Sequence, residues 1–179
     1  SRISVNEIFR RYIVGAYSAV DFELAPTLKL TPSVRIDYFA RQDRLTFSPR
    51  LQLQQRFGNV TAKGAMGRYT RGPDNDAQAV ATDLRPEVAN QYVLGIEAPV
   101  KTWGSVAATV FYNKRSDLVS TDPAVAANNS TGLPYVSTGS GRTTGAEVLL
   151  KYLNGNFFGW VSYTLALSER RDSPTARVR

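Results

Sequence analysis

A strict alternation of apolar and polar side chains in residues 91–119 constrains the fold more than any other feature of the sequence. The stretch reads QYVLGIEAPVKTWGSVAATVFYNKRSDLV, two alternating runs joined by a turn at residues 99–104. Side chains with a period of two lie on opposite faces of a β-strand. The apolar face of this predicted hairpin carries Tyr92, Leu94, Ile96, Ala98, Val106, Ala108, Val110 and Tyr112. A soluble sandwich would bury that face in its core, whereas an outer-membrane barrel would turn it toward lipid.

The composition excludes several kinds of chemistry. The 179 residues include no Cys and no His, so disulfides, thiolate nucleophiles and imidazole bases or metal ligands are excluded. No base–nucleophile pair stands out, and we expect neither enzyme activity nor a cofactor. The net charge of +7 is scattered without a Lys/Arg-rich run, which argues against a nucleic-acid partner. No apolar run approaches the roughly 20 residues of a transmembrane helix.

The same alternation recurs along the rest of the chain. It predicts further strands at residues 12–24, 28–40, 47–57, 60–69, 144–152 and 157–168. Gly58-Asn59 and Asn154-Gly155 are typical of tight hairpin turns. Together with the hairpin of residues 91–119 this makes about eight strands, each close to the roughly 9–11 residues that a tilted membrane strand needs.

The predicted connections alternate in length. Short turns follow the first, third, fifth and seventh strands, whereas a polar loop at residues 41–46 and long polar segments at residues 70–90 and 116–137 follow the others. Short turns on one rim and longer loops on the other are typical of outer-membrane barrels. Tyr38, Tyr112 and Tyr152 near strand ends, and Trp103 in a turn, fit an interfacial aromatic girdle. The predicted fold class is therefore all-β, an antiparallel up-and-down transmembrane β-barrel.

Two other motifs have ordinary structural interpretations. Asp74-Asn75-Asp76 could offer oxygen ligands to calcium, but it lacks the spacing of a calcium loop and reads as a polar loop. Gly139-Ser140-Gly141 precedes a strand rather than a helix, so it predicts a bend or β-bulge and no phosphate site.

Four segments together resemble a known family. They are LRPEVANQYVLGIE, SVAATVFYNKRSDLV, YVSTGSGRTTGAEVLLKY and FFGWVSYTLALSER, and their order is similar to that in the middle-to-late barrel of TonB-dependent outer-membrane receptors. FSPRLQL and AMGRYTRGP resemble the preceding hairpin of that barrel. The resemblance implies a barrel of about 22 strands with a plugged lumen, of which residues 1–179 would be one part. We expect the plug domain, its energy-coupling box and the barrel-closing strands to lie outside these residues.

The resemblance also implies a function. TonB-dependent receptors reside in the bacterial outer membrane and take up a scarce ligand such as a siderophore, a cobalamin, a glycan or a peptide. The implied partners are outer-membrane lipid, the remainder of the barrel with its plug, and a TonB-type energy-coupling complex that acts through the plug. This chain would then supply a segment of the wall.

Two sets of residues are candidate sites. Polar residues opposite the apolar faces would line the lumen or contact the plug: Arg35, Asp37, Arg50, Gln52, Lys63, Glu97, Glu147 and Lys151. The plainer interpretation is that these charges pair with one another or are solvated. Residues in the long segments would contact ligand, because loops on a rigid scaffold carry recognition: Arg71, Asp74, Asp76, Arg85, Asn128, Asn129 and Tyr135.

Two alternative architectures make different structural predictions. A complete small structural or adhesive barrel of about eight strands requires its first and last strands to pair. A soluble β-sandwich binding module requires Leu94, Ile96, Val110 and Val148 to be buried in a protein core. A segment of a large barrel requires neither.

Overall fold

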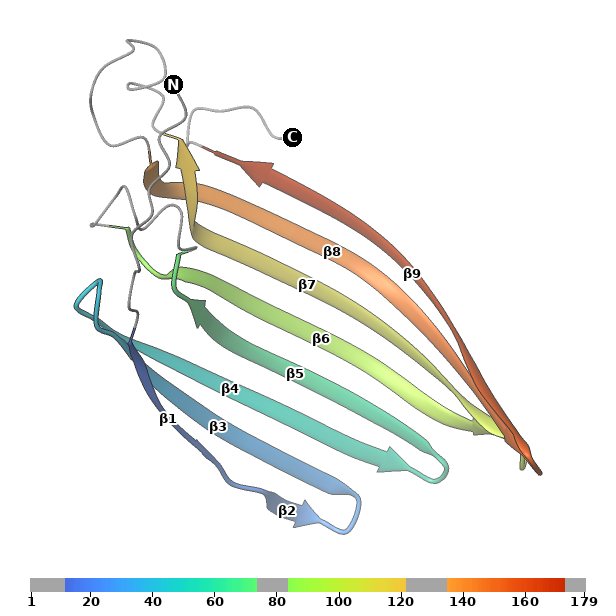
Figure 1. Ribbon diagram of the computed structural model, residues 1–179. Helices are drawn as coiled ribbons and strands as arrows, with labels where there is room; N and C mark the ends of the chain where they lie inside the picture. The colour runs from blue at the N-terminus through green and yellow to red at the C-terminus, as the bar shows by residue number, and fades with distance from the viewer. Residues whose placement is uncertain (1–11, 74–83, 122–134, 173–179) are drawn as a thin grey trace.

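The chain forms one antiparallel β-sheet (Figure 1). The computed structural model describes residues 12–73, 84–121 and 135–172. Its strands are β1 (Ile13–Ala19), β2 (Phe22–Ala25), β3 (Leu28–Phe39), β4 (Arg44–Phe57), β5 (Val60–Arg71), β6 (Glu87–Val100), β7 (Gly104–Thr121), β8 (Tyr135–Asn154) and β9 (Phe157–Arg171). Within the described residues, no helix has the length and hydropathy needed to cross a membrane.

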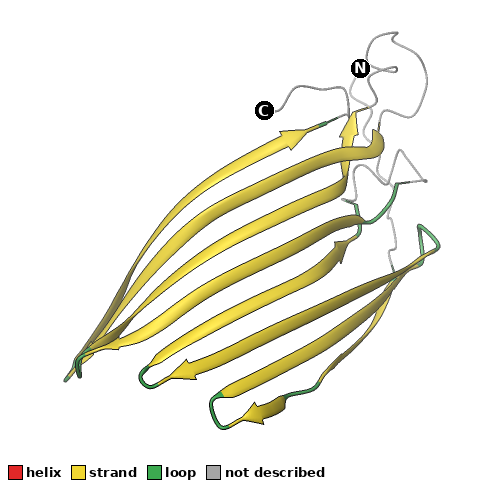
Figure 2. Cartoon of the chain, turned by 180° about the vertical axis from the view of Figure 1, so that it is seen from behind, coloured by secondary structure: helices red, strands yellow, loops and turns green. Residues whose placement is uncertain are grey.

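The strands follow one another across the sheet in chain order. The order is β1-β3-β4-β5-β6-β7-β8-β9, with β2 also paired to β3, and every pairing is antiparallel. The sheet is a single curved layer with β1 and β9 at its two edges, so it is an open segment of wall (Figures 1 and 2). The pairing of first and last strands that a closed eight-stranded barrel requires is not formed, and that alternative is wrong.

A proline divides the first predicted strand into β1 and β2. The register against β3 continues unchanged across the break, from Ala19 opposite Ser33 to Phe22 opposite Leu30, and shifts farther on, between Glu23 and Ala25. Between β1 and β2, the Val20 backbone N–H donates to the Pro32 carbonyl oxygen at 3.1 Å. Proline has no N–H to return that bond, so the ladder is interrupted there. The sheet therefore has nine strands where about eight were predicted.

The strands extend farther toward the long-loop rim than the sequence predicted. The predicted loop 70–90 is shortened by β5, which continues to Arg71, and by β6, which begins at Glu87. The predicted loop 116–137 is shortened by β7, which reaches Thr121, and by β8, which begins at Tyr135 rather than near residue 144. Those boundaries were wrong because apolar residues such as Val88, Leu118 and Val119 are scattered among polar and small ones in these extensions, so no regular alternation marks them.

Tight turns join the strands at the opposite rim. Phe57 pairs with Val60 across Gly58, and Asn154 pairs with Phe157 across Gly155. The two glycines have φ of 57° and 59°, the left-handed region that a two-residue hairpin needs at its first central position. The predicted alternation of short and longer connections is confirmed in the described strands, whose short turns gather at one end of the sheet (Figure 2).

The two faces of the sheet differ in chemistry and in exposure. Cross-strand register places the apolar residues of neighbouring strands on one face, which we call the outer face, for example Leu94 opposite Val110 and Ile96 opposite Ala108. On this face Leu94, Ile96, Val110 and Val148 are between 47% and 65% exposed. The soluble-sandwich prediction of a buried apolar core is therefore wrong, because nothing among the described residues packs on this face. Polar residues occupy the other, inner face and are the less exposed set along β6.

The outer apolar band has the height of a bilayer core. On β8 it runs from Tyr152, whose ring lies 5.4 Å from that of Trp103, to the first charged outer-face residue, Arg142. Ten residues at about 3.3 Å each give a strand length of about 33 Å, and a tilt of about 40° reduces this to about 25 Å. That height matches the lipid-facing band of an outer-membrane barrel.

Candidate lumen face and its rim

The predicted lumen residues all lie on the inner face of the sheet. Strand register fixes this for each of them: β3 carries Arg35 and Asp37, β4 carries Arg50 and Gln52, β5 carries Lys63, β6 carries Glu97, and β8 carries Glu147 and Lys151. They are gathered in two groups, one nearer the short turns and one higher on β3–β5. Whether any of them contacts a plug stays a prediction.

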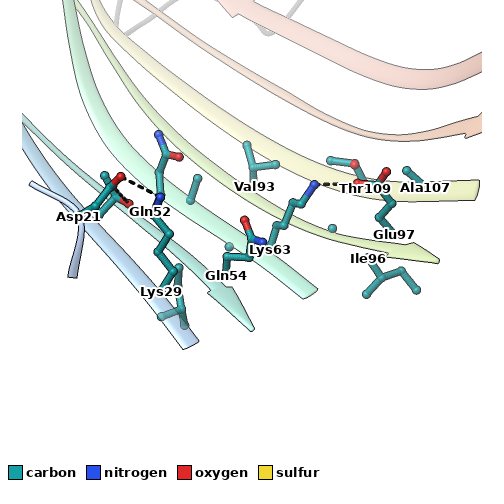
Figure 3. Close-up of a pocket in the computed structure, with 15 residues that line it drawn as sticks. Asp21, Lys29, Gln52, Gln54, Lys63, Val93, Ile96, Glu97, Ala107 and Thr109 are labelled. Carbon is teal, nitrogen blue, oxygen red and sulfur yellow. Dashed lines mark hydrogen bonds and ion pairs between the residues drawn. The ribbon is translucent and has the colours of Figure 1, made fainter. Parts of the chain in front are cut away.

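The first group lines a hollow of about 460 Å³ on the inner face (Figure 3). At one side, Lys63 Nζ donates to Glu97 Oε2 at 2.7 Å. At the other side, Asp21 pairs with Lys29 at 2.7 Å and accepts a hydrogen bond from Thr31 Oγ1 at 2.6 Å. The first ion pair joins β5 to β6, and the second joins the break between β1 and β2 to β3.

Amides and small side chains occupy the middle of this hollow. The side chains of Gln52 and Gln54 project between the two ion pairs, and Thr109 lies on the far side (Figure 3). Farther along β8, Glu147 Oε2 accepts a hydrogen bond from Thr164 at 3.1 Å. The result is a surface with donors and acceptors at fixed positions and little uncompensated charge, suited to hydrogen bonding with a polar surface laid against it.

The second group contains a fork-shaped ion pair on one strand. Arg35 Nε and Nη2 donate to the two carboxylate oxygens of Asp37 at 2.8 and 2.7 Å. Asp37 is only 4% exposed, and a bidentate guanidinium partner is the arrangement best suited to a buried carboxylate. Gly15 on β1 makes room for the pair, because a Cβ at that position would collide with the Asp37 carboxylate. The pair therefore satisfies itself, as the plainer sequence interpretation predicted for such charges.

Arg50 is held differently from the other inner-face charges. Its guanidinium carbon lies 4.1 Å from the centre of the Tyr69 ring, a cation–π contact. Gly67 opposite Arg50 permits this approach, since a Cβ there would lie 2.9 Å from Arg50 Cγ. The Arg50 Nε is buried and has no hydrogen-bond partner among the described residues. Arg50 is thus the inner-face cation with an unsatisfied donor, a feature the sequence did not single out.

Predicted ligand-contact residues stand at the long-loop rim. Arg71 donates to Glu87 at 2.9 Å, and Arg85 lies 3.5 Å from Asp117 while its own guanidinium side chain is 68% exposed. Tyr135 packs with Val119 against the buried Leu84. The remaining candidates, Asp74, Asp76, Asn128 and Asn129, lie outside the described residues.

A bulge in β7 shapes this rim. The register between β7 and β8 shifts between Arg115 and Leu118 and again between Leu118 and Val119, opposite Gly139, where the sequence predicted a bulge. That prediction is confirmed. Asp117 within the bulge has a φ of 56°, a left-handed conformation that aspartate adopts more readily than most residues.

Two side chains, one from the neighbouring strand β6 and one from β9, hold the residue after the bulge. The Val119 N–H donates to Glu87 Oε1 at 3.5 Å, and Arg170 Nη2 donates to the Val119 carbonyl oxygen at 2.7 Å. Arg170 also pairs with Asp172 at 2.7 Å. The sequence analysis missed these two contacts with Val119. They depend on the register that brings β6, β7 and β9 together, and no local sequence pattern predicts that register.

The inner-face and rim residues offer no metal centre in the part of the chain that the structure describes. Among the described residues, no cluster of His, Cys, Asp or Glu has the size to hold a metal ion.

Comparison with solved structures finds the same fold in much larger proteins. The chain resembles the siderophore receptor PirA from Pseudomonas aeruginosa, with a TM-score of 0.68 and 22% identity over 88% of this chain and 32% of that one. It resembles the FrpB iron transporter from Neisseria meningitidis, with a TM-score of 0.74 and 15% identity over 93% of this chain and 28% of that one. A third is the outer membrane transporter YddB from Escherichia coli, with a TM-score of 0.72 and 16% identity over 88% of this chain and 24% of that one.

The sequence comparison places the chain in a family. No curated protein matches the sequence. The chain spans between 24% and 32% of the length of the three solved structures, all of them receptors or transporters by description. The family described as TonB dependent receptor-like, beta-barrel matches residues 3–177, nearly the whole sequence. This chain therefore belongs to the TonB-dependent receptor-like β-barrel family.

Proposed function

We propose that the chain is part of the wall of a bacterial outer-membrane receptor that takes up a scarce ligand with energy from a TonB-type complex. Residues 1–179 would belong to one barrel domain, whose plug and closing strands come from outside these residues. The chain would act in transport rather than catalysis, with no cofactor and no nucleic-acid partner. Its immediate partners would be outer-membrane lipid, the remaining barrel strands, the plug and, through the plug, the energy-coupling complex.

The inverted distribution of apolar and polar side chains is the observation that supports this proposal most directly. Leu94 is 65% exposed on the outer face, whereas Asp37 is 4% exposed on the inner face. In water this arrangement would leave a large apolar surface unburied. In a bilayer it is the stable one, because lipid covers the apolar face and the polar face lines an aqueous or protein-filled lumen.

The inner face offers two kinds of contact to a plug. The hollow between Lys63–Glu97 and Asp21–Lys29 presents amides that could accept and donate hydrogen bonds. The unsatisfied Arg50 Nε is one donor that a plug carbonyl or carboxylate would satisfy after a small movement of the guanidinium. Contacts of this kind are weak one by one, so the plug could be held and still be displaced during transport.

The rim favours an anionic, oxygen-rich ligand. Arg71 and Arg85 expose 67% and 68% of their side chains, and the carboxylates that orient them leave part of each guanidinium free to donate. Tyr135 packs against Leu84, the residue before Arg85, and adds an aromatic surface to the rim. Ferric siderophores carry such oxygen groups, and two of the solved structures are a siderophore receptor and an iron transporter by description. A cobalamin, glycan or peptide remains the alternative ligand class.

An uptake assay tests the proposal. Cells lacking the receptor gene would be complemented with the native gene and supplied with radiolabelled iron bound to a catecholate or a hydroxamate siderophore. We expect uptake that requires the gene and stops when a protonophore collapses the inner-membrane gradient. The variant R71Q/R85Q should raise the half-saturating concentration about tenfold or more, as expected for loss of two charge-assisted hydrogen bonds.

The matched control is a cation on the opposite rim. Lys101 lies in the turn between β6 and β7, away from the long loops, so K101Q should take up ligand like the native receptor. Gene-dependent uptake that continues after the protonophore would contradict energised transport. Absence of uptake of every ligand class, with the receptor folded in the membrane, would contradict the transport function altogether.

A further inference from the structure

A row of cations crosses the outer face just above the apolar band. Register aligns Arg68 on β5, Asn90 on β6, Lys114 on β7, Arg142 on β8 and Glu169 on β9 as direct cross-strand neighbours. Because these residues share the parity of the apolar outer face, they point away from the lumen. We call this set, together with the neighbouring Arg171, the cationic collar. It contains four cations and one carboxylate.

The cationic collar lies at the level where lipid headgroups meet the protein. The next row toward the short turns contains Tyr92 opposite Tyr112, whose ring centres are 6.3 Å apart. Tyrosines in such a row mark the membrane–water interface, and two residues along a strand advance about 7 Å. The collar is therefore displaced by about 7 Å toward the long-loop rim, which in such barrels faces the outside.

The charges of the cationic collar are poorly compensated by the protein itself. Arg142 Nε donates to Glu169 Oε2 at 2.7 Å, yet the Arg142 side chain is still 62% exposed. Arg68 and Lys114 are exposed and form no hydrogen bond or ion pair with any described residue. Lys114 and Arg142 stand directly opposite one another, and like charges in that position destabilise a sheet. An anion seated between them would remove that repulsion.

The surface between these cations is hollowed. A hollow of about 270 Å³ is lined by several cations, among them Lys114, Arg142 and Arg171, with Tyr112 at its lower side. Glu169 also lines it, and its carboxylate is already paired with Arg142. This volume suits a phosphate group with part of a sugar, and the tyrosine beneath it suits the apolar part of the same molecule. Arginine forks bind phosphate oxygens in a bidentate way, and lysine adds a point charge.

We propose that the cationic collar binds the phosphorylated headgroup of an outer-leaflet lipid. The inference rests on the membrane orientation in the proposed function and does not depend on which ligand is transported. The lipid phosphate sits between Lys114, Arg142 and Arg171, while the acyl chains lie along the apolar rows below. Position and charge together favour a lipid over a free anion, since only a lipid also meets the apolar band.

Binding of defined lipids to the intact receptor tests the inference. The receptor, extracted from membranes in a neutral detergent, would be titrated with bisphosphorylated lipid A, with its dephosphorylated analogue and with inorganic phosphate, and bound lipid would be counted by native mass spectrometry. We expect tight binding of the phosphorylated lipid alone. The variant K114Q/R142Q should weaken it by about 30-fold, from the loss of two cations at an anionic headgroup.

The control variant removes the same charge elsewhere. K101Q/R56Q changes two cations near the short-turn rim and should bind the lipid like the native receptor. Equal weakening by both variants would overturn the inference in favour of diffuse charge attraction. Equal affinity for the dephosphorylated lipid, or for inorganic phosphate, would overturn the role of the headgroup. Failure of the native receptor to associate with any lipid or detergent would overturn the membrane placement itself, and with it the proposed function.

Discussion

Replacing Val148 by arginine tests the orientation of the sheet most directly. Val148 lies on the outer face of β8, between Tyr152 and Arg142 and close to the middle of the apolar band, and it is 47% exposed. At the midplane of a bilayer an arginine costs about 2–4 kcal/mol, so the folding equilibrium should fall by about 30- to 700-fold. On a water-facing sheet the same substitution at an exposed site would change stability by about 0.5 kcal/mol or less.

The assay is reversible denaturation of the intact receptor in lipid vesicles, followed by tryptophan fluorescence. The matched control is L149R, one residue along β8 and on the inner face, which should cost about 1 kcal/mol or less. A depth control is F157R at the short-turn rim, where an arginine costs about 0–1 kcal/mol. A small cost for V148R, or an equal cost for L149R, would refute the assignment of the outer face to lipid.

Three further experiments probe packing, pairing and turn geometry, each measured by the same denaturation assay. G145A should destabilise the sheet by about 1–3 kcal/mol, because its Cβ would lie 2.6 Å from a backbone carbonyl oxygen. G159A, whose Cβ would meet nothing within 4 Å, should be neutral or slightly stabilising. Equal effects of the two variants would contradict the close packing at Gly145. A double-mutant cycle on Lys63 and Glu97, both partly exposed, should give a coupling below about 1 kcal/mol, and a larger value would mean that the pair is screened from solvent. G58A should cost about 1–2 kcal/mol, since alanine resists a φ of 57°, and no loss would indicate that the turn relaxes.

The sequence predicted the part of the fold on which the bilayer acts. Between the two rows of outer-face aromatic residues, lipid requires one apolar face. Residues such as Leu94 and Val110 therefore alternate with polar ones, and this alternation makes the strands predictable from the sequence. Beyond those rows the backbone ladder continues, but apolar and polar residues no longer alternate regularly, although Leu84 and Leu118 are buried there. The strand from Tyr135 to Thr143 was therefore missed although its hydrogen bonds are intact.

The candidate site was predictable in composition but not in its pairings. The period of two alone places Lys63, Glu97 and Lys151 on one face. That Lys63 meets Glu97, or that Arg50 stacks on Tyr69, depends on the register between strands, which turn geometry sets at a distance. The division of the first predicted strand into β1 and β2 was likewise missed. The proline that causes it, Pro32, lies on the neighbouring strand β3, and its missing N–H interrupts the pairing of the strand opposite.

The separation of the two faces has a consequence for assembly. If β8 slipped by one residue against its neighbours, Glu147 and Lys151 would be turned into lipid while Val148 and Leu150 entered the lumen. A cation in lipid costs about 2–4 kcal/mol near the midplane and about 0–1 kcal/mol near the interface, where Lys151 lies beside Tyr152. Slips of β3, β4, β5 and β6 would likewise turn inner-face charges such as Arg35, Arg50 and Lys63 toward lipid. The bilayer therefore favours the correct register between strands, because a slipped strand would place charged side chains in lipid and raise the free energy of the sheet.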